Sequence, residues 1–108
     1  MNTLGSNNTA IGNYAFFTNT TGSQNVGIGY EAGYYETGTN KLFIDNQKRT
    51  NESDGRVKAL IYGEFASSTS DQRLFLNSNV LVSNNLSISG SLIASGSIII
   101  FPTSSVAP

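Results

Sequence analysis

A six-residue repeat runs without a gap from residue 73 to residue 102 and constrains the fold more than any other feature. The second and fourth positions of each repeat are apolar, and the fifth and sixth positions of the first four repeats are Ser, Asn or Gly. A unit this short cannot bury its own apolar face, so it must stack on neighbouring units or on other chains. The apolar positions are Leu74, Leu76, Val80, Val82, Leu86, Ile88, Leu92, Ala94, Ile98 and Ile100.

Each repeat is typical of a short extended strand. Alternation places the second and fourth positions on one face of the strand, and the small pair that follows bends the chain every six residues. One strand with a single apolar face is not stable in water. We therefore expect residues 73–102 to form a shaft in which strands from three chains wind about a common axis, as in a triple β-helix. Antiparallel packing within one chain is the alternative arrangement.

A second, longer repeat occupies the first 45 residues. The segment 5–12 aligns with segment 22–29 after 17 residues and with segment 38–45 after 16 more. Each unit opens with Gly-Ser or Gly-Thr followed by Asn or Gln, which favours a tight turn with positive φ. The pattern predicts a parallel stack of short strands, a β-solenoid, that ends with the third unit.

Each of these units contains one expected strand. The residue at the centre of the strand is Ala10, Gly27 or Phe43, so the face to which it points is small until the third unit. The two residues beside it point to the opposite face. This second face carries Thr9 and Ile11, Val26 and Ile28, and Leu42 and Ile44, and we expect Ile11, Val26, Ile28, Leu42 and Ile44 to join the core between chains.

The region between the two repeats holds most of the charged residues. Residues 46–57 are expected to form a solvated loop, residues 58–65 a strand in which Gly63 indicates a bulge or a close approach, and no segment is expected to be helical. The predicted organisation is a head over residues 1–45, a junction over 46–72, a shaft over 73–102 and a tail over 103–108.

Composition narrows the range of functions. The chain has 108 residues, a net charge of −1 and only 12% charged residues, which gives no electrostatic basis for binding nucleic acid. Its apolar runs are far shorter than the ~20 residues that span a membrane, so membrane insertion is not expected. A small chain with no Cys and no His lacks disulfide and zinc cross-links, which leaves oligomerisation as the means of stabilising it.

The first two head units carry a fairly specific motif. The segments Asn8-Thr9-Ala10-Ile11-Gly12-x-x-Ala15 and Thr21-Gly22-Ser23-Gln24-Asn25-Val26-Gly27-Ile28-Gly29-x-x-Ala32-Gly33 resemble the head repeats of trimeric autotransporter adhesins and of bacteriophage tail-fibre proteins, a group that often carries an endosialidase-type intramolecular chaperone. The segment Thr39-Asn40-Lys41-Leu42-Phe43-Ile44-Asp45, followed later by Leu60-Ile61-Tyr62-Gly63-Glu64-Phe65, is similar to the shaft region that follows such heads, so the resemblance covers roughly residues 5–65.

The resemblance implies an elongated, all-β homotrimer with a left-handed parallel β-roll as its head. It also implies a structural or attachment role in a virion tail fibre or at a cell surface, with a glycan or a protein as receptor. Only two full head repeats and a partial third are present, and no chaperone domain is recognised.

Catalytic chemistry finds little support in the residues. Without Cys and His, the common nucleophilic triads and the ordinary zinc and haem sites are excluded, and no cofactor or metal site is expected. Seven acidic residues remain, and none is spaced as a defined glycosidase pair. A non-enzymatic fibre segment is therefore the expected function. A tail-spike-like glycan hydrolase and a self-polymerising filament are the alternatives.

One aromatic cluster is a candidate contact surface. Tyr30, Tyr34 and Tyr35 follow the second expected strand, and Phe16 and Phe17 occupy a similar place one unit earlier. Stacking of the rings along the solenoid or at a subunit interface is the simpler interpretation. A sugar-stacking platform is the alternative, with Tyr30, Tyr34 and Tyr35 as the contact residues.

Overall fold

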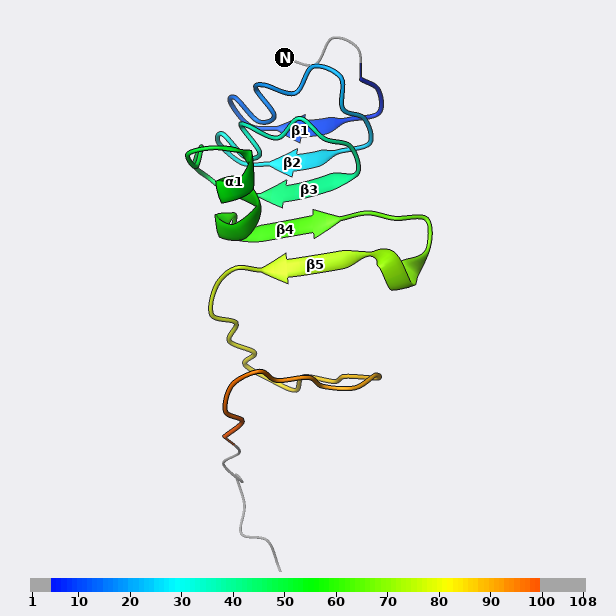
Figure 1. Cartoon of the computed structure of the whole chain (residues 1–108). Coiled ribbons are helices and arrows are strands. Elements are labelled where there is room, and N and C mark those ends of the chain that lie inside the picture. Colours follow the sequence, from blue (N-terminus) through cyan, green and yellow to red (C-terminus); the bar gives the residue numbers. More distant parts are fainter. Residues whose placement is uncertain (1–4, 100–108) are drawn as a thin grey trace, which may run out of the picture.

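The computed structural model describes residues 5–99 (Figure 1). Its elements in chain order are β1 (Thr9–Ile11), β2 (Val26–Ile28), β3 (Lys41–Ile44), α1 (Glu52–Lys58), β4 (Ile61–Glu64), a 3-10 turn at Thr69–Asp71, and β5 (Arg73–Leu76). The strands form one open sheet in the order β1-β2-β3-β4-β5. The regular structure is thus mostly sheet with one short helix, which agrees with the all-β class at this coarse level.

The first three strands follow the 17- and 16-residue spacing of the sequence repeat. They pair in parallel with Thr9 opposite Val26 and with Val26 opposite Leu42, so equivalent residues of the three units lie side by side. The loops between them stack as well, because the N–H of Phe16 donates to the carbonyl of Ala32 and the N–H of Thr18 donates to that of Tyr34. The repeat read from the sequence is therefore a repeat in space.

Backbone conformation repeats with the same spacing. Asn7, Gln24 and Asn40 lie in the left-handed region with φ near +60°, at equivalent places in the three units. The sequence predicts a turn with positive φ at the start of each unit, and the Asn or Gln of that turn has this conformation. Asn adopts positive φ more readily than most residues other than Gly. Gly29 has φ +120°, and a Cβ there would lie 1.8 Å from a backbone oxygen, so this position requires glycine.

Asparagine side chains, half-buried at Asn8 and buried at Asn25, join each unit to the next. The Oδ1 of Asn8 accepts the N–H of Asn25, and the Oδ1 of Asn25 accepts the N–H of Lys41. The Nδ2 of Asn8 donates to the carbonyl of Gly22, and the Nδ2 of Asn25 donates to that of Gly38. These bonds satisfy polar backbone groups inside turns that no sheet ladder reaches.

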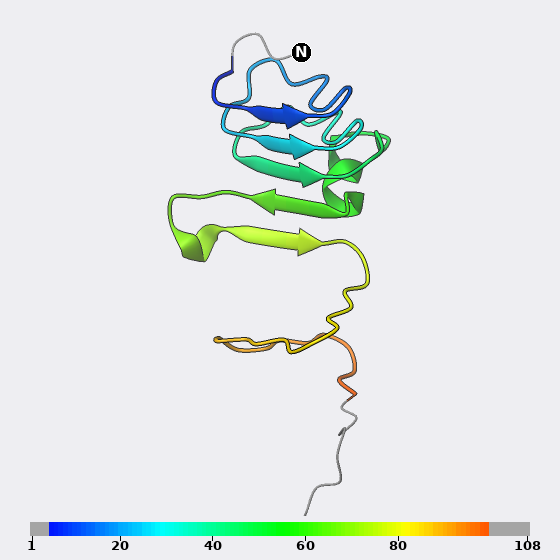
Figure 2. The ribbon, with the colours of Figure 1, turned by 180° about the vertical axis from the view of Figure 1, so that it is seen from behind.

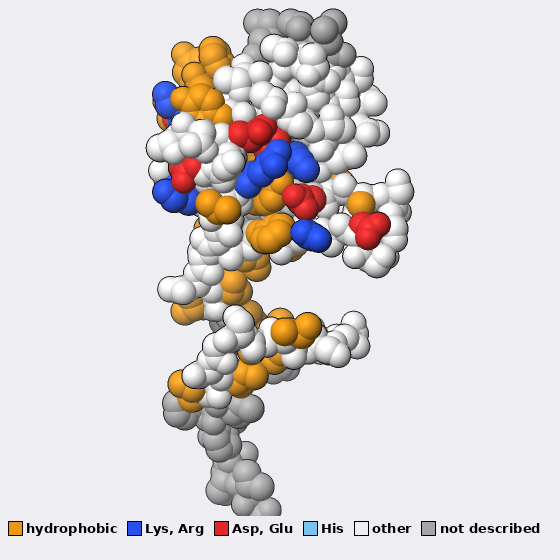
Figure 3. Space-filling model, in the orientation of Figure 1, with side chains coloured by type: hydrophobic (Ala, Val, Ile, Leu, Met, Phe, Trp, Pro, Cys, Tyr) orange, Lys and Arg blue, Asp and Glu red, His pale blue; other side chains and the backbone are white. Residues whose placement is uncertain are grey.

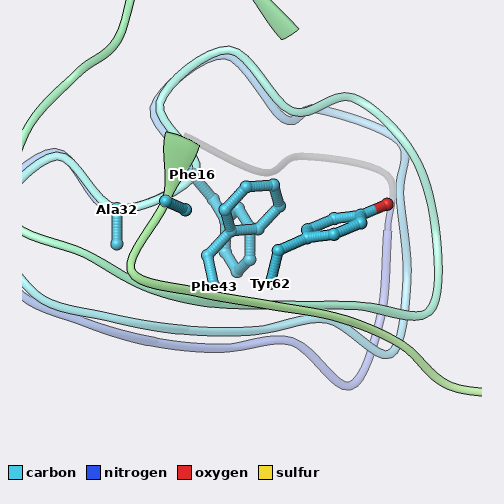
Figure 4. Close-up of a cluster of buried hydrophobic side chains, with 5 residues drawn as sticks. Phe16, Ala32, Phe43 and Tyr62 are labelled. Atoms are coloured by element: carbon cyan, nitrogen blue, oxygen red, sulfur yellow. The ribbon is translucent and has the colours of Figure 1, made fainter. Parts of the chain in front are cut away.

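The core of the single chain lies on the face of the sheet that carries Ala10, Gly27 and Phe43. The loops after β1 and β2 fold over this face, and a Cβ at Gly27 would lie 2.5 Å from the ring of Phe16. The ring centroids of Phe43 and Phe16 are 6.0 Å apart, and those of Phe43 and Tyr62 are 5.1 Å apart. The buried apolar residues are Phe16, Ala32, Phe43, Ala59 and Tyr62 (Figure 4).

The expectation that no segment is helical is wrong. Residues Glu52–Lys58 form α1, and the side chain of the N-cap residue Asn51 accepts the N–H of Asp54. Acidic residues lie in the first turn and basic residues in the last, which suits the helix dipole. Because the helix has only seven residues, fewer than two turns of the 3.6-residue period, the apolar pattern that normally reveals a helix has no room to appear.

After α1 the sheet continues in the antiparallel sense. Strand β4 pairs with β3, and β5 pairs with β4. The strand predicted over residues 58–65 is observed at Ile61–Glu64, and the unbroken register around Gly63 shows a close approach to Leu42 and no bulge. The third unit is thus the last parallel one, as predicted, and the first hexad forms the edge strand β5.

The remaining hexads do not pair within the described chain. From residue 77 to residue 99 the chain has no strand and bends at 83–84, 89–90 and 95–96, and it runs to one side and returns before it continues away from the sheet (Figure 1). Only the first hexad takes the antiparallel arrangement within one chain that was the alternative for the whole segment. Ile100 and the tail over residues 103–108 lie outside the described residues.

Candidate interaction surfaces

One face of the sheet presents two columns of side chains that the loops do not cover, here called the apolar face. In Figure 2 this face is turned toward the viewer, and the loops and α1 lie behind it. Residues that are directly opposite on neighbouring strands project to the same side, so strand register fixes both columns. One column is Ile11, Ile28, Ile44, Ile61 and Leu76, and the other is Thr9, Val26, Leu42, Gly63 and Leu74.

The apolar face is only partly buried by the chain itself. Ile11 is 59% exposed, Ile28 39% and Leu74 64%, while Leu42 and Ile44 are half-buried by their neighbours on the sheet. Shallow apolar grooves cross the face, one lined by residues that include Ile28 and Ile44 and another by residues that include Leu42 and Leu74. The face therefore offers a partner both exposed apolar area and grooves into which side chains can pack.

The hexad repeat begins on this face. Leu74 and Leu76 are the second and fourth positions of the first hexad, and they complete the two columns at β5. The central residue, Phe75, points to the opposite face and contacts the ring of Tyr62 at a centroid distance of 5.5 Å. The side of the hexad that was predicted to face an axis is thus continuous with the apolar face of the head.

The same positions are exposed in the later hexads. Among the described residues, the exposed second and fourth positions include Val80, Val82, Leu86, Ile88, Leu92 and Ile98, which are 46–69% exposed, and Ala94 is also exposed. No strand of the described chain shelters them. In the described chain these hexad positions are therefore left largely uncovered.

The aromatic cluster lies on the loops at the other side of the sheet. The rings of Phe17 and Tyr34, one unit apart, stack with centroids 5.0 Å apart, and Tyr14 and Tyr35 extend the row at 5.2 Å from Phe17 and 4.8 Å from Tyr34. We call these four residues the aromatic stripe. Phe16 is not part of it, because its side chain points into the core (Figure 4). Tyr30 is 51% exposed, and no ring contact joins it to the stripe within residues 5–99.

A buried carboxylate fixes α1 to the second unit. Glu36 is 1% exposed and forms a bidentate pair with the guanidinium of Arg56, with N–O distances of 2.9 and 2.7 Å. The hydrogen bond from Arg56 to Glu36 raises the pKa of the guanidinium. Glu36 also accepts the N–H of Gly38, and Asn19, 17 residues earlier, accepts that of Gly22. The 17-residue spacing between Asn19 and Glu36 is the sequence signal that identifies these two buried polar residues as equivalent.

Other ion pairs hold the junction in place. Asp45 is bidentate with Arg49, and Asp54 contacts Lys58 at 2.9 Å within α1. The hydrogen bond from Lys58, with further bonds from Thr50, lowers the pKa of Asp54 to about 2. The pKa of Glu52 is also lowered, mainly by the hydrogen bond that the N–H of Thr37 donates to it. Residues 46–57 therefore form a charged but ordered segment, which ion pairs and hydrogen bonds join to the end of the second unit and to Asp45.

Five of the seven acidic side chains take part in ion pairs: Glu36, Asp45, Glu52, Asp54 and Glu64. In the part of the chain that the structure describes, no group of three or more acidic residues is placed to bind a metal ion. Over residues 5–99 no helix has the length and apolar character needed to cross a membrane. The exposed features that remain are the apolar face, the hexads and the aromatic stripe.

Comparison with protein-family models, with curated proteins and with solved structures finds no match to this chain. The functional argument therefore depends on the geometry of the chain itself.

Proposed function

We propose that this chain is a non-enzymatic segment of an attachment fibre, in which three copies pack their apolar faces around one axis. In this proposal the three stacked units are turns of a left-handed β-roll, a solenoid that forms the head. The hexads form a triple-stranded shaft below it. The resemblance of the head motif to adhesin and tail-fibre repeats suggests a virion tail fibre or a cell surface as the location, and a glycan or a protein as the receptor.

The observation that carries the proposal is the shared side of head and hexads. Leu74 and Leu76 belong to both the sheet columns and the hexad pattern, so the apolar side of the first hexad is part of the apolar face of the head. Three strands that meet along the hexads would bring three apolar faces together along the head.

The exposed area supports association. The chain has an accessible surface of 8003 Å², whereas a compact monomer of this mass exposes about 5,800 Å². The difference, about 2,200 Å², exceeds the roughly 1,600 Å² that two standard contacts of ~800 Å² would remove from one chain. The radius of gyration is 17.6 Å, against about 13 Å for a compact domain of this length. An elongated chain with this much excess surface fits a fibre better than a globule.

The two alternatives draw on different observations. The glycan hydrolase needs a pair of available carboxylates, and the ion pairs of five acidic residues disfavour it. The self-polymerising filament is favoured by the third hexad positions, because Leu81 is 89% exposed and Ile93 90% exposed. Lateral contacts through these side chains would join shafts to one another.

Oxidative cross-linking of single-cysteine variants tests the threefold arrangement, because the natural chain has no cysteine. Leu86→Cys places a thiol at a second hexad position, where three thiols would surround the axis. Oxidation should join two of the three chains by a disulfide and leave the third thiol free, which is about one third of the total. Such a disulfide reports close packing, because it forms only when the two Cα atoms lie within about 7 Å. Leu81→Cys, at a third position, should stay reactive toward maleimide and form no such dimer. Equal cross-linking of the two variants would contradict the proposal.

A further inference from the structure

The aromatic stripe is a second exposed surface that the threefold contact does not use. Tyr14 is 47% exposed and Phe17 44% exposed, and both lie on the loop after β1, which covers the opposite face of the sheet. The chain's own core, with Phe16 and Phe43, separates this loop layer from the apolar face. Three chains that meet through their apolar faces would turn the stripe outward.

The stripe is a continuous and preformed array. Its rings touch in sequence from Tyr14 through Phe17 and Tyr34 to Tyr35, with centroids 4.8–5.2 Å apart. The ammonium of Lys48 lies 5.0 Å from the ring centroid of Tyr34. Figure 3 shows apolar side chains gathered beside the carboxyl ends of β1 to β3, with basic groups at their margin. Stacked units hold these rings, so little ordering would accompany binding.

The polar groups of the stripe are uncommitted. Over residues 5–99 no hydrogen bond uses the hydroxyl of Tyr14, Tyr34 or Tyr35, whereas the buried Tyr62 donates to Glu64. Lys48 forms no ion pair with a described residue. Because Phe17 stacks on Tyr34 and Lys48 lies over the ring of Tyr34, the stripe presents ring edges and the remaining ring faces. It combines them with several hydrogen-bonding groups that the described residues leave unused.

We propose that the aromatic stripe binds a carbohydrate, with pyranose rings lying against the exposed parts of the aromatic rings and sugar hydroxyls bonded to the tyrosine hydroxyls and Lys48. A sugar ring presents C–H groups on its faces and hydroxyls at its edge, which matches this mixture of groups. The low charge of the chain disfavours nucleic acid. A peptide added as a strand needs a free sheet edge, and the stripe lies on loops. This inference names the receptor class of the proposed attachment function and depends on it for the outward orientation.

Saturation-transfer NMR on the full chain tests the inference, with chitotetraose, maltotetraose, sialyllactose and oligogalacturonate as probes and gelatin as a protein ligand. At least one saccharide should receive saturation on its ring C–H protons. Phe17→Ala should weaken that binding at least fivefold. Val57→Ala should leave it unchanged, because Val57 is 67% exposed on α1 and outside the stripe.

The remaining outcomes separate this inference from the proposed function. Binding of no saccharide, or of gelatin alone, overturns the carbohydrate assignment. A thiol in Phe17→Cys that maleimide cannot reach in the assembled protein also overturns it, because the stripe would then be a subunit interface. If sedimentation shows a single chain, the fibre proposal fails, while the saccharide titration still decides whether the stripe binds sugar.

Discussion

The hexads contain a matched pair of residues that tests whether one side of the repeat is covered in the proposed assembly. Ile88 occupies the fourth position of its repeat and is 46% exposed, whereas Ile93 occupies the third position of the next repeat and is 90% exposed. Replacing each with Asp makes the same chemical change five residues apart. In a lone extended chain both carboxylates would be solvated, and neither change would matter.

In the proposed assembly the two changes differ by many kcal/mol. Full burial of an Ile is worth ~1.5–3 kcal/mol, so covering the exposed 46% of Ile88 contributes about 0.7–1.4 kcal/mol per chain, or about 2–4 per trimer. Ile88→Asp forfeits this and places three like charges near one axis, each with a desolvation penalty of several kcal/mol. The total exceeds about 10 kcal/mol, which is sufficient to dissociate the trimer.

Sedimentation velocity at micromolar chain concentration measures the difference. Ile88→Asp should sediment as a single chain, and Ile93→Asp should sediment like the parent protein. Equal behaviour of the two variants would refute the assignment of the fourth position to an interior. Loss of assembly in Ile93→Asp alone would reverse the assignment of the two sides.

Three further predictions concern the fold. Phe43→Ala should lower the free energy of unfolding by about 3–5 kcal/mol in a denaturant titration, because Phe43 is 1% exposed at the centre of the core. Arg56→Ala should cost about 3 kcal/mol by leaving the buried carboxylate of Glu36 without its cation, and the double change with Glu36→Gln should recover part of that loss. The melting temperature should fall as pH decreases from about 4 toward 2, because the pKa of Asp54 is about 2 in the folded chain against 3.8 for an unperturbed Asp. The stabilisation from ionised Asp54 is complete above the pKa of the unfolded chain and is lost as the pH falls through the pKa of the folded chain. The melting temperature of Asp54→Asn should therefore fall less over the same pH range.

Much of the head follows from short-range sequence signals. The 17-residue spacing predicts the parallel strands with nearly their observed bounds, and alternation within each strand identifies its two faces. Tyr14 and Glu31, which are 17 residues apart, both have φ near +60°. These features were predictable because each depends on a local turn or on the next unit along the chain.

The content of the core was harder to predict. Gly27 leaves room beneath it, and the ring that fills this space comes from Phe16, eleven residues earlier in a loop. The partner of Glu36 is Arg56, twenty residues away across the junction. Contacts of this kind depend on how loops fold over the sheet, and no periodicity in the sequence encodes them. The helix α1 was missed for a related reason, since its stability comes from its N-cap and its ion pairs.

The mass of the purified chain in solution, measured by sedimentation equilibrium, tests the central claim most directly. One chain has a mass of 11.5 kDa. The account predicts a single species of three times this mass, about 34.5 kDa, which is independent of concentration in the micromolar range. A stable, monodisperse species of 11.5 kDa would contradict it, because the apolar face and the hexads would then remain in water.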